Sequence, residues 1–427
     1  MRRALAPVGD LLVKDQLHRP DDDRSRQSEG VVLRMSVSRT YEEINEKIKS
    51  GKAVVLTADE VVELAEERGI SYVAKNVDVV TTATFGAMCS SGAFLNFGHS
   101  DPPIKMGKIW LNDVPAYGGI AAVDAYIGAT EMSETKPFEY GGAHVIEDLI
   151  AGKPIKLRAT SYGTDCYPRT EIETYVTKDM LNQAYMFNPR NAYQNYPVAV
   201  NTSSRTIYTY LGTLLPRLGN AVYSSAGQLS PLLNDPYYRT IGVGTRIFLG
   251  GAAGYVAWEG TQHNPSVERN DKGIPVSGSG TLALIGDLKA MDRRYVRAAV
   301  MQRYGVTLYV GVGIPIPVLD EDMAERVCVR DEDIHTSVVD YSVPNRSRPV
   351  LGRVTYKDLR SGAIELNGNR IPTVPLSSLS KAREIAEELK GWVQSGQMLL
   401  QEPVQQLPRE QATKPLEIVD LEEINNG

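Results

Sequence analysis

The chain has 427 residues, of which 42% are hydrophobic and 23% charged, and its formal net charge is −6. This length predicts two domains, or one large domain with an appendage, and the acidic balance argues against nucleic acid or an anionic membrane as a partner. Three cysteines in so long a chain do not form a disulfide framework. No apolar run is long enough to span a bilayer or to act as a signal sequence, so we expect a cytoplasmic protein without a membrane segment.

The first part of the chain alternates helix and strand patterns. Residues 1–36 are polar and charged without periodicity, which predicts a disordered N-terminal tail. Capping-box patterns at Thr40–Glu43 and Thr57–Glu60 each predict the start of a helix, and residues 54–56 between those helices have the composition of a short strand. The alternation predicts the α/β class, with a mixed, glycine-rich, sheet-centred catalytic domain over 37–345.

Strand formers and glycines dominate the middle of the chain. Residues 77–84 have a buried-strand pattern that places Cys89 on the following loop, where ligands gather in open α/β sheets. Three similar strand patterns run into glycine-rich loops, at 241–254, 276–281 and 308–315. We expect a functional site among the loops that follow such strands.

The last part of the chain predicts a small β-meander and a helix. Short strands are expected at 352–356, 363–366 and 370–373. Asn367–Gly368 is a strong hairpin signal, and residues 380–393 form a capped amphipathic helix pattern. We expect residues 346–405 to pack on the same domain and residues 406–427 to form a flexible C-terminal tail.

Two of the three cysteines lie among glycines and hydroxyl residues. Cys89 lies in Thr84-Phe-Gly-Ala-Met-Cys-Ser-Ser-Gly92, and Cys166 lies in Thr160-Ser-Tyr-Gly-Thr-Asp-Cys-Tyr-Pro168. Small neighbours leave a thiol approachable and surround it with donors that can hold a thiolate or a persulfide. Cys328, in a strand-like run of valines and charges, is expected to be inert.

For Cys89, two interpretations are equally favoured by the residues alone. In the first, it is a nucleophilic or sulfur-carrying thiol to which Ser90, Ser91 and Thr84 donate hydrogen bonds. In the second, it is a small buried residue packed against Met88 and Phe94.

For Cys166, a functional role is slightly favoured. Arg169 and Arg158 are nearby cations that would lower the pKa of a thiol, whereas Asp165 acts in the opposite direction. The alternative is a turn cysteine held before Pro168.

Further candidates for substrate binding are Arg169, Arg205, His99, Gly250 and Gly251. The arginines and the N–H groups of the glycine loop suit a carboxylate, and His99 suits an acid or base. The alternatives are a surface arginine, a hydrogen-bonded loop histidine and, favoured for the glycine loop, close backbone packing.

The sequence holds 22 tyrosines against six phenylalanines, which suits polar-lined pockets or subunit contacts and leaves a homo-oligomer open; a composition habit of the source organism is an equally favoured explanation. It has no Cys-x-x-Cys pair and no histidine cluster, so no bound metal is expected.

Several segments together resemble one known family, the homocysteine biosynthesis proteins of archaea and some bacteria. The segments are Tyr41-Glu-Glu-Ile-Asn-Glu-Lys-Ile-Lys-Ser-Gly-Lys-Ala-Val-Val-Leu-Thr57, Thr84–Gly92, Tyr140-Gly-Gly-Ala-His144, Thr160–Pro168 and Val374-Pro-Leu-Ser-Ser-Leu-Ser-Lys-Ala-Arg383. The resemblance covers about 37–405 and implies L-aspartate 4-semialdehyde sulfurtransferase activity. The two essential cysteines of the family fall on Cys89 and Cys166. Some members carry paired CBS domains at the carboxyl end, and we do not expect such a module here.

The resemblance implies that L-homocysteine forms from L-aspartate 4-semialdehyde and a sulfide-level sulfur donor. A persulfide on one cysteine attacks the aldehyde, and the second cysteine then attacks the sulfur–sulfur bond. In methanogens the family resembles one half of a system whose other half is a small ferredoxin-like iron–sulfur protein. We therefore expect an external reductant of that kind and no bound cofactor. Direct exchange requires the two Cα atoms to come within about 7 Å unless the backbone moves.

Two alternatives come from other functional classes. The first is a persulfide carrier or thiol-based binding protein that delivers sulfur to another enzyme. The second is a non-catalytic ligand-binding or scaffold protein that uses the glycine loops, with thiols that are buried and slow to alkylate.

Overall fold

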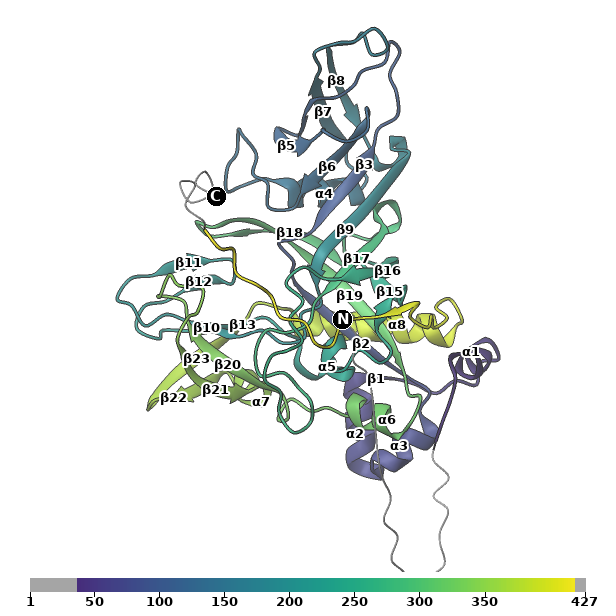
Figure 1. The fold of residues 1–427 in the computed structure, drawn as a ribbon, viewed down its shortest axis with the longest axis vertical. Coiled ribbons are helices and arrows are strands. Elements are labelled where there is room, and N and C mark those ends of the chain that lie inside the picture. The colour runs from purple at the N-terminus through teal and green to yellow at the C-terminus, as the bar shows by residue number, and fades with distance from the viewer. Residues whose placement is uncertain (1–36, 419–427) are drawn as a thin grey trace, which may run out of the picture. The chain divides into compact units, whose positions relative to one another are not determined.

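The computed structural model describes residues 37–418, so the expected tail over 1–36 and the end of the expected C-terminal tail lie outside it. Within the described residues, a 14-stranded mixed sheet and a six-stranded sheet form the framework, with helices packed on them (Figure 1). The predicted α/β class is confirmed. Between residues 37 and 418 no helix is long and apolar enough to cross a membrane.

The large sheet carries the elements that position both loop cysteines. Its order is β1 (Val55–Thr57), β2 (Val79–Ala87), β19 (Gly305–Pro317), β15 (Arg246–Leu249), β16 (Ala252–Glu259), β17 (Leu282–Asp287), β9 (Gln183–Asn191), β3 (Gly92–Asn96), β6 (Asp124–Gly128), β5 (Val114–Tyr117), β4 (Lys108–Leu111), β7 (Ile155–Thr160) and β8 (Glu171–Val176), and β18 (Val296–Met301) also pairs with β19. Apart from the parallel pair β1–β2, the pairings of this sheet are antiparallel. Figure 1 shows β7 and β8 at one end of the sheet, far from β1 and β2.

The helices are short, and most of them cover the large sheet. They are α1 (Tyr41–Lys49), α2 (Ala58–Arg68), α3 (Ile70–Asn76), α4 (Gly142–Ile150), α5 (Pro231–Asn234), α6 (Glu321–Val327), α7 (Tyr356–Arg360) and α8 (Leu379–Gln394). Both predicted capping boxes are confirmed, because Thr40 and Thr57 each exchange side-chain and backbone hydrogen bonds with the glutamate three residues later. The predicted last helix is α8.

The glycine-rich stretch at 308–315 is wrongly predicted to run from a strand into a loop, because it lies inside the continuous strand β19. Helix α8 packs on this strand. A Cβ added to Gly311 would lie only 2.7 Å from Cδ1 of Ile385 on that helix. Leu389 lies in the same way 3.0 Å from a Cβ position on Gly313. These glycines therefore allow close packing of a helix on a strand.

The second sheet combines segments that are far apart in the sequence. Its order is β21 (Val350–Thr355), β20 (His335–Asp340), β10 (Val198–Val200), β13 (Ala221–Tyr223), β23 (Asn369–Pro375) and β22 (Ala363–Leu366). The hairpin at Asn367–Gly368 is confirmed, with both residues at positive φ. The predicted meander is wrong, because α7 follows β21 and three strands from earlier in the chain separate β21 from the β22–β23 hairpin.

The segment after residue 405 differs from the expected flexible tail as far as the structure describes it. β24 (Gln405–Gln406) pairs with β14 (Gly242–Val243), and Leu407 is 2% exposed. The imidazole Nε2 of buried His263 lies 3.0 Å from the carbonyl oxygen of Pro408. This histidine therefore anchors the segment on the body of the protein.

Candidate functional site

Cys89 lies at the tip of a tight turn between β2 and β3. The N–H of Met88 donates to the Leu308 carbonyl at 2.7 Å, and the N–H of Ser91 donates to the Met88 carbonyl at 3.0 Å. These two bonds hold Cys89 at the point where a fully buried strand ends, and its side chain is exposed. The alternative of a buried packing residue is therefore wrong.

The two serines after Cys89 fix the turn against β9. Ser90 Oγ donates to Asn188 Oδ1 and to the Arg190 carbonyl, both at 2.9 Å, and Asn188 Nδ2 donates to Ser91 Oγ at 2.7 Å. The Ser90 proton is thus already engaged, which contradicts its predicted role as a donor to sulfur. The serines position the thiol through the neighbouring strand.

Cys89 lines two adjoining cavities. The inner cavity has a volume of about 70 Å³ and extends beneath the turn toward Thr84, Ser225 and Thr307. The outer cleft has a volume of about 710 Å³ and lies between the large sheet and the second sheet, where Val339 and Val350 belong to its wall. The thiol therefore stands between a small internal chamber and an open cleft.

Three arginines give the outer cleft a positive charge. Arg190, Arg346 and Arg348 line it, and among residues 37–418 its lining contains neither aspartate nor glutamate. Over the described residues none of the three makes an ion pair. The Arg348 guanidinium lies 4.2 Å from the centre of the Tyr341 ring, and its buried Nε has no hydrogen-bond partner in this part of the chain. The cleft is thus suited to a small anion.

A chain of tyrosine hydroxyls forms another part of the cleft wall. Tyr210 Oη lies 2.8 Å from Tyr196 Oη and 2.8 Å from Tyr341 Oη. Burial, with the neighbouring tyrosines, raises the pKa of Tyr196 and of Tyr341 above the usual value, so these hydroxyls stay protonated and act as neutral donors. Burial likewise raises the pKa of Tyr193, beside Cys89, to about 12.

The reactivity of Cys89 depends on two opposing effects. Burial of its sulfur by the surrounding protein raises the pKa of the thiol, and the positive charge of Arg190 lowers it in part. Although the side chain is open to solvent, protein atoms surround enough of the sulfur to disfavour the thiolate. Arg190 therefore provides the main favourable charge for an anionic sulfur at this position.

Cys166 is also exposed, on the loop that joins β7 to β8. The loop is closed by reciprocal bonds between the backbones of Thr164 and Tyr167, and the Thr164 hydroxyl lies 3.9 Å from the Cys166 sulfur. Arg169 donates to the carbonyls of Asp101 and Pro102, both at 2.9 Å, so it braces the base of the loop.

His99, a candidate acid or base, and Arg158, a cation predicted near Cys166, both contact aromatic rings. His99 stacks on Tyr167 at 6.0 Å between ring centres. Arg158 lies over the Trp110 ring, with its Cζ 3.8 Å from the ring centre. Thr164 is therefore the side chain that contacts the sulfur.

The two cysteines lie at opposite ends of their strands. The β3 row at Phe94 continues through Tyr126, Tyr117 and Lys108 to Thr160 on β7. On one side of this row the chain leaves β3 at Gly92 and reaches Cys89. On the other side, the side of Asn96, the chain leaves β7 at Thr160 and reaches Cys166.

Four strand steps separate β3 from β7 in the sheet, which at the usual spacing is roughly 19 Å across the strands. Figure 1 shows β7 and β8 extending away from β2. Within one chain, the structure does not bring the two sulfurs into disulfide range.

With this geometry established, comparison with known proteins identifies the family. Residues 53–400 match the family described as homocysteine biosynthesis enzyme, sulfur-incorporation. The chain belongs to this family.

Two members named L-aspartate semialdehyde sulfurtransferase, from Methanosarcina acetivorans and Methanocaldococcus jannaschii, are each 54% identical to it, over 89% of this chain and 74% and 75% of their own lengths. An uncharacterized protein from Methanothermobacter thermautotrophicus is 33% identical over 77% of this chain and 73% of its own length. No solved structure matches the chain significantly. The resemblance found in the sequence is thus confirmed, and it makes this a member of a family of sulfur-incorporating enzymes.

The remaining sequence candidates of this homocysteine biosynthesis protein lie away from Cys89. Arg205 is on an exposed loop and lines neither Cys89 cavity. Gly250 and Gly251 form the turn between β15 and β16 at positive φ, packed against Met291 and Tyr295, so their role is close packing rather than anion binding. Of the glycine-rich segments, only residues 277–279 line the cleft.

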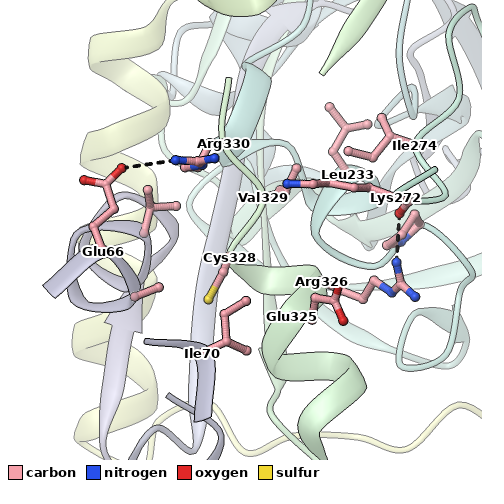
Figure 2. Close-up of a pocket in the computed structure, with 13 residues that line it drawn as sticks. Glu66, Ile70, Leu233, Lys272, Ile274, Glu325, Arg326, Cys328, Val329 and Arg330 are labelled. Carbon is pink, nitrogen blue, oxygen red and sulfur yellow. Dashed lines mark hydrogen bonds and ion pairs between the residues drawn. The ribbon is translucent and has the colours of Figure 1, made fainter. Parts of the chain in front are cut away.

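Cys328 lines a different cavity of about 220 Å³ (Figure 2). It caps the end of α6 and not a strand, which corrects the predicted strand-like run. Burial and the negative charge of Glu325 raise the pKa of this thiol to about 12. Arg330 and Lys272 in the same cavity are paired with carboxylates. The inertness expected of Cys328 is consistent with this setting.

The most informative cleft residues were not predicted. Arg190, Arg348, Tyr196, Tyr210 and Tyr341 come from distant segments, and none lies in a recognisable motif. The only signal in the sequence is the excess of tyrosine, which suggested polar-lined pockets. Across residues 37–418 there is no cluster of His, Cys, Asp or Glu side chains that could hold a metal ion.

Proposed function

We propose that this chain is an L-aspartate semialdehyde sulfurtransferase that forms L-homocysteine, with Cys89 as the residue that carries the sulfur. The observation on which this depends most is the exposed Cys89 thiol inside a cleft lined by three arginines and no acidic residue. The relatives named L-aspartate semialdehyde sulfurtransferase supply the reaction, and the cleft supplies a place for an aldehyde that carries a carboxylate.

In the proposed complex, Arg348 binds the substrate carboxylate. It is the cleft cation whose Nε lacks a partner among the described residues, and its stacking on Tyr341 holds the guanidinium plane in place. Arg190, which lowers the pKa of the Cys89 thiol, then stabilises an anionic sulfur on Cys89. The tyrosine hydroxyls donate to the aldehyde oxygen as negative charge develops on it.

In the proposed chemistry the two cysteines return to the same oxidation state after each cycle. Hydrosulfide attacks a disulfide between Cys89 and Cys166, giving a Cys89 persulfide and a free Cys166 thiolate without net oxidation or reduction. The persulfide attacks the aldehyde carbon and forms a disulfide-linked hemithioacetal. The Cys166 thiolate then attacks the Cys89 sulfur, so the protein disulfide forms again and the substrate leaves as a geminal hydroxythiolate at the aldehyde oxidation level.

Loss of water from that product gives a thioaldehyde, and two electrons with two protons convert it to the thiol of homocysteine. The electrons have to come from an external donor because the cysteine cycle is redox-neutral. In this proposal the donor is a ferredoxin-like iron–sulfur protein, the kind of partner that the family resemblance implies. This balance corrects the simpler expectation in which reduction serves only to open the protein disulfide.

The test is steady-state formation of homocysteine from aspartate semialdehyde, sulfide and a reduced ferredoxin or a low-potential chemical reductant. We expect turnover by the wild type, a loss of at least 100-fold in Cys89→Ser and Cys166→Ser, and wild-type rates in the control Cys328→Ser. Full activity of Cys89→Ser would show that the sulfur is carried elsewhere.

The second candidate function is a persulfide carrier, which the exposed Cys166 on its projecting loop favours. A carrier transfers one sulfur per chain and stops. Formation of many equivalents of homocysteine per chain therefore refutes the carrier, and a single stoichiometric burst supports it.

A further inference from the structure

One face of the large sheet carries a row of four aromatic side chains, three of them exposed and one partly buried. Phe94 stands opposite Tyr126 on β6 and opposite Tyr185 on β9, and Tyr117 on β5 stands opposite Tyr126. Directly opposite residues project to the same side of a sheet. The rings of Phe94 and Tyr126 are in contact, with 4.8 Å between their centres. We call these four residues the aromatic sheet face.

The aromatic sheet face is open, whereas the reverse side of the same strands is buried. Phe94 is 38% exposed, Tyr185 44% and Tyr117 61%. On the reverse side, Ala93, Ile127 and their neighbours are fully buried, and α4 contacts β3 and β6. A continuous row of tyrosine and phenylalanine that is largely uncovered in the described part of the chain is typical of a protein–protein interface.

The position of this face relates it to the two thiols. Strands β3, β6 and β5 carry most of the face, and these strands also lie between the Cys89 turn and the Cys166 loop in the sheet order. The proposed function requires the two sulfurs to exchange, yet in one chain they leave opposite ends of strands that are four steps apart. A protein bound to the aromatic sheet face would cover the strands that separate the Cys89 turn from the Cys166 loop.

The charges of the two loops match. The Cys166 loop exposes Asp165 next to the thiol, exposed Glu171 follows at the start of β8, and the loop's Arg169 is engaged with backbone carbonyls at its base. The Cys89 cleft presents three arginines, and its volume of about 710 Å³ leaves room beside a four-carbon substrate. An acidic loop tip therefore fits a cleft that has no acidic residue of its own.

We propose that a second copy of this chain docks on the aromatic sheet face and brings its Cys166 loop into the Cys89 cleft of the first. The inference rests on the proposed function, since it supplies the thiol that the chemistry requires. A two-fold axis exchanges the two loops, so one interface builds two equivalent sites. In each site the Cys166 thiolate of one copy attacks the Cys89 sulfur of the other, a disulfide forms between the copies, and the substrate sulfur leaves with the electron pair.

The decisive experiment is complementation between two inactive chains. Cys89→Ser and Cys166→Ser chains with different affinity tags are co-expressed, and the species that carries both tags is isolated. It contains one intact site, formed from the Cys89 of one chain and the Cys166 of the other, and we expect about half of the wild-type turnover per dimer. If the two cysteines react within a single chain, the doubly tagged species has no turnover. That result would overturn the proposal.

Oxidative cross-linking tests the arrangement independently of turnover. After mild oxidation, we expect wild-type chains to run as covalent dimers on a non-reducing gel and Cys89→Ser or Cys166→Ser chains to run as monomers. A Cys89–Cys166 disulfide found by peptide mapping within a monomeric band refutes the proposal.

Variants of the face test the docking surface. We expect Tyr117→Lys to sediment as a monomer and to lose turnover at least tenfold, while its circular dichroism stays native. The matched control Val404→Lys changes a residue that is 78% exposed on a different surface and should stay dimeric and active. A wild-type chain that is monomeric and fully active at assay concentration overturns the proposal. If instead Cys89→Ser and Cys166→Ser both stay active, the proposed chemistry is wrong. Sedimentation and oxidative cross-linking of the wild-type chain then still test whether two copies dock.

Discussion

The role given to Arg348 leads to a prediction about substrate recognition. The change is Arg348→Ala, which removes the guanidinium that stacks on Tyr341 and whose Nε has no partner among the described residues. A hydrogen bond to a charged group contributes about 1.5–3 kcal/mol. The loss of one such bond to the substrate carboxylate corresponds to a decrease of about 10- to 150-fold in kcat/KM. We expect most of the change in KM.

The same change has only a small effect on folding. The stacking of Arg348 on Tyr341 is worth about 0.5–1 kcal/mol at a partly exposed site. The free energy of unfolding should therefore fall by no more than about that amount, and lost activity will not reflect lost protein. Arg348→Lys keeps the charge without the planar fork and should fall between the wild type and Arg348→Ala.

The assay compares two aldehydes. With aspartate semialdehyde, Arg348→Ala should be impaired as calculated. With 3-aminopropanal, which is the same molecule without its carboxylate, the wild type and Arg348→Ala should react at the same rate. Arg370→Ala, on an exposed part of β23, serves as the control. If Arg348→Ala keeps kcat/KM for aspartate semialdehyde within twofold of wild type, or loses as much with 3-aminopropanal, the carboxylate role of Arg348 is wrong.

Further predictions concern the wall of the cleft and the thiol itself. Tyr210→Phe removes two hydrogen bonds of 2.8 Å, so the free energy of unfolding should fall by about 2 kcal/mol in urea titrations, and an unchanged midpoint would contradict the bonds. The raised pKa of Cys89 predicts that its alkylation by iodoacetamide accelerates about tenfold per pH unit between about pH 7 and 9. Arg190→Ala raises that pKa further and should slow the alkylation at pH 7.5, whereas Arg190→Lys should restore it. Gly92→Ala should disturb the Cys89 turn and lower turnover, because its Cβ would overlap the Tyr126 ring.

Local sequence rules predicted the elements whose determinants lie within a few residues. The capping boxes at Thr40 and Thr57, the hairpin at Asn367–Gly368 and the last helix each depend on short-range hydrogen bonds or on turn conformation, and all were found. The predicted meander was wrong because strand pairing depends on long-range contacts. No local signal says that β10 and β13 insert between β20 and β23.

The site was predictable only in part for the same reason. The residues around Cys89 correctly predicted a loop after a buried strand, but they left an accessible thiol and a buried packing residue equally favoured, and the structure shows the exposed thiol. The arginines of the cleft could not be found, because Arg190 and Arg348 are far apart in the sequence and meet only where the two sheets face each other. For Gly250 the favoured interpretation, close backbone packing, agrees with its N–H donating to the Gly311 carbonyl at 2.8 Å, whereas the candidate role in ligand binding has no support from this contact.

The environments of the two thiols suggest a division of labour. Cys89 is surrounded by protein that raises its pKa, and it lies where a small anion and the tyrosine donors can meet it. Such a position favours addition of the sulfur to an aldehyde bound in the cleft. Cys166 stands exposed on a braced loop, where another protein surface can reach it. A thiol that must leave one site and enter another is better placed on such a loop than in a cleft. The distance between the two cysteines, which at first contradicts a shared mechanism, is therefore what a site shared between two chains requires.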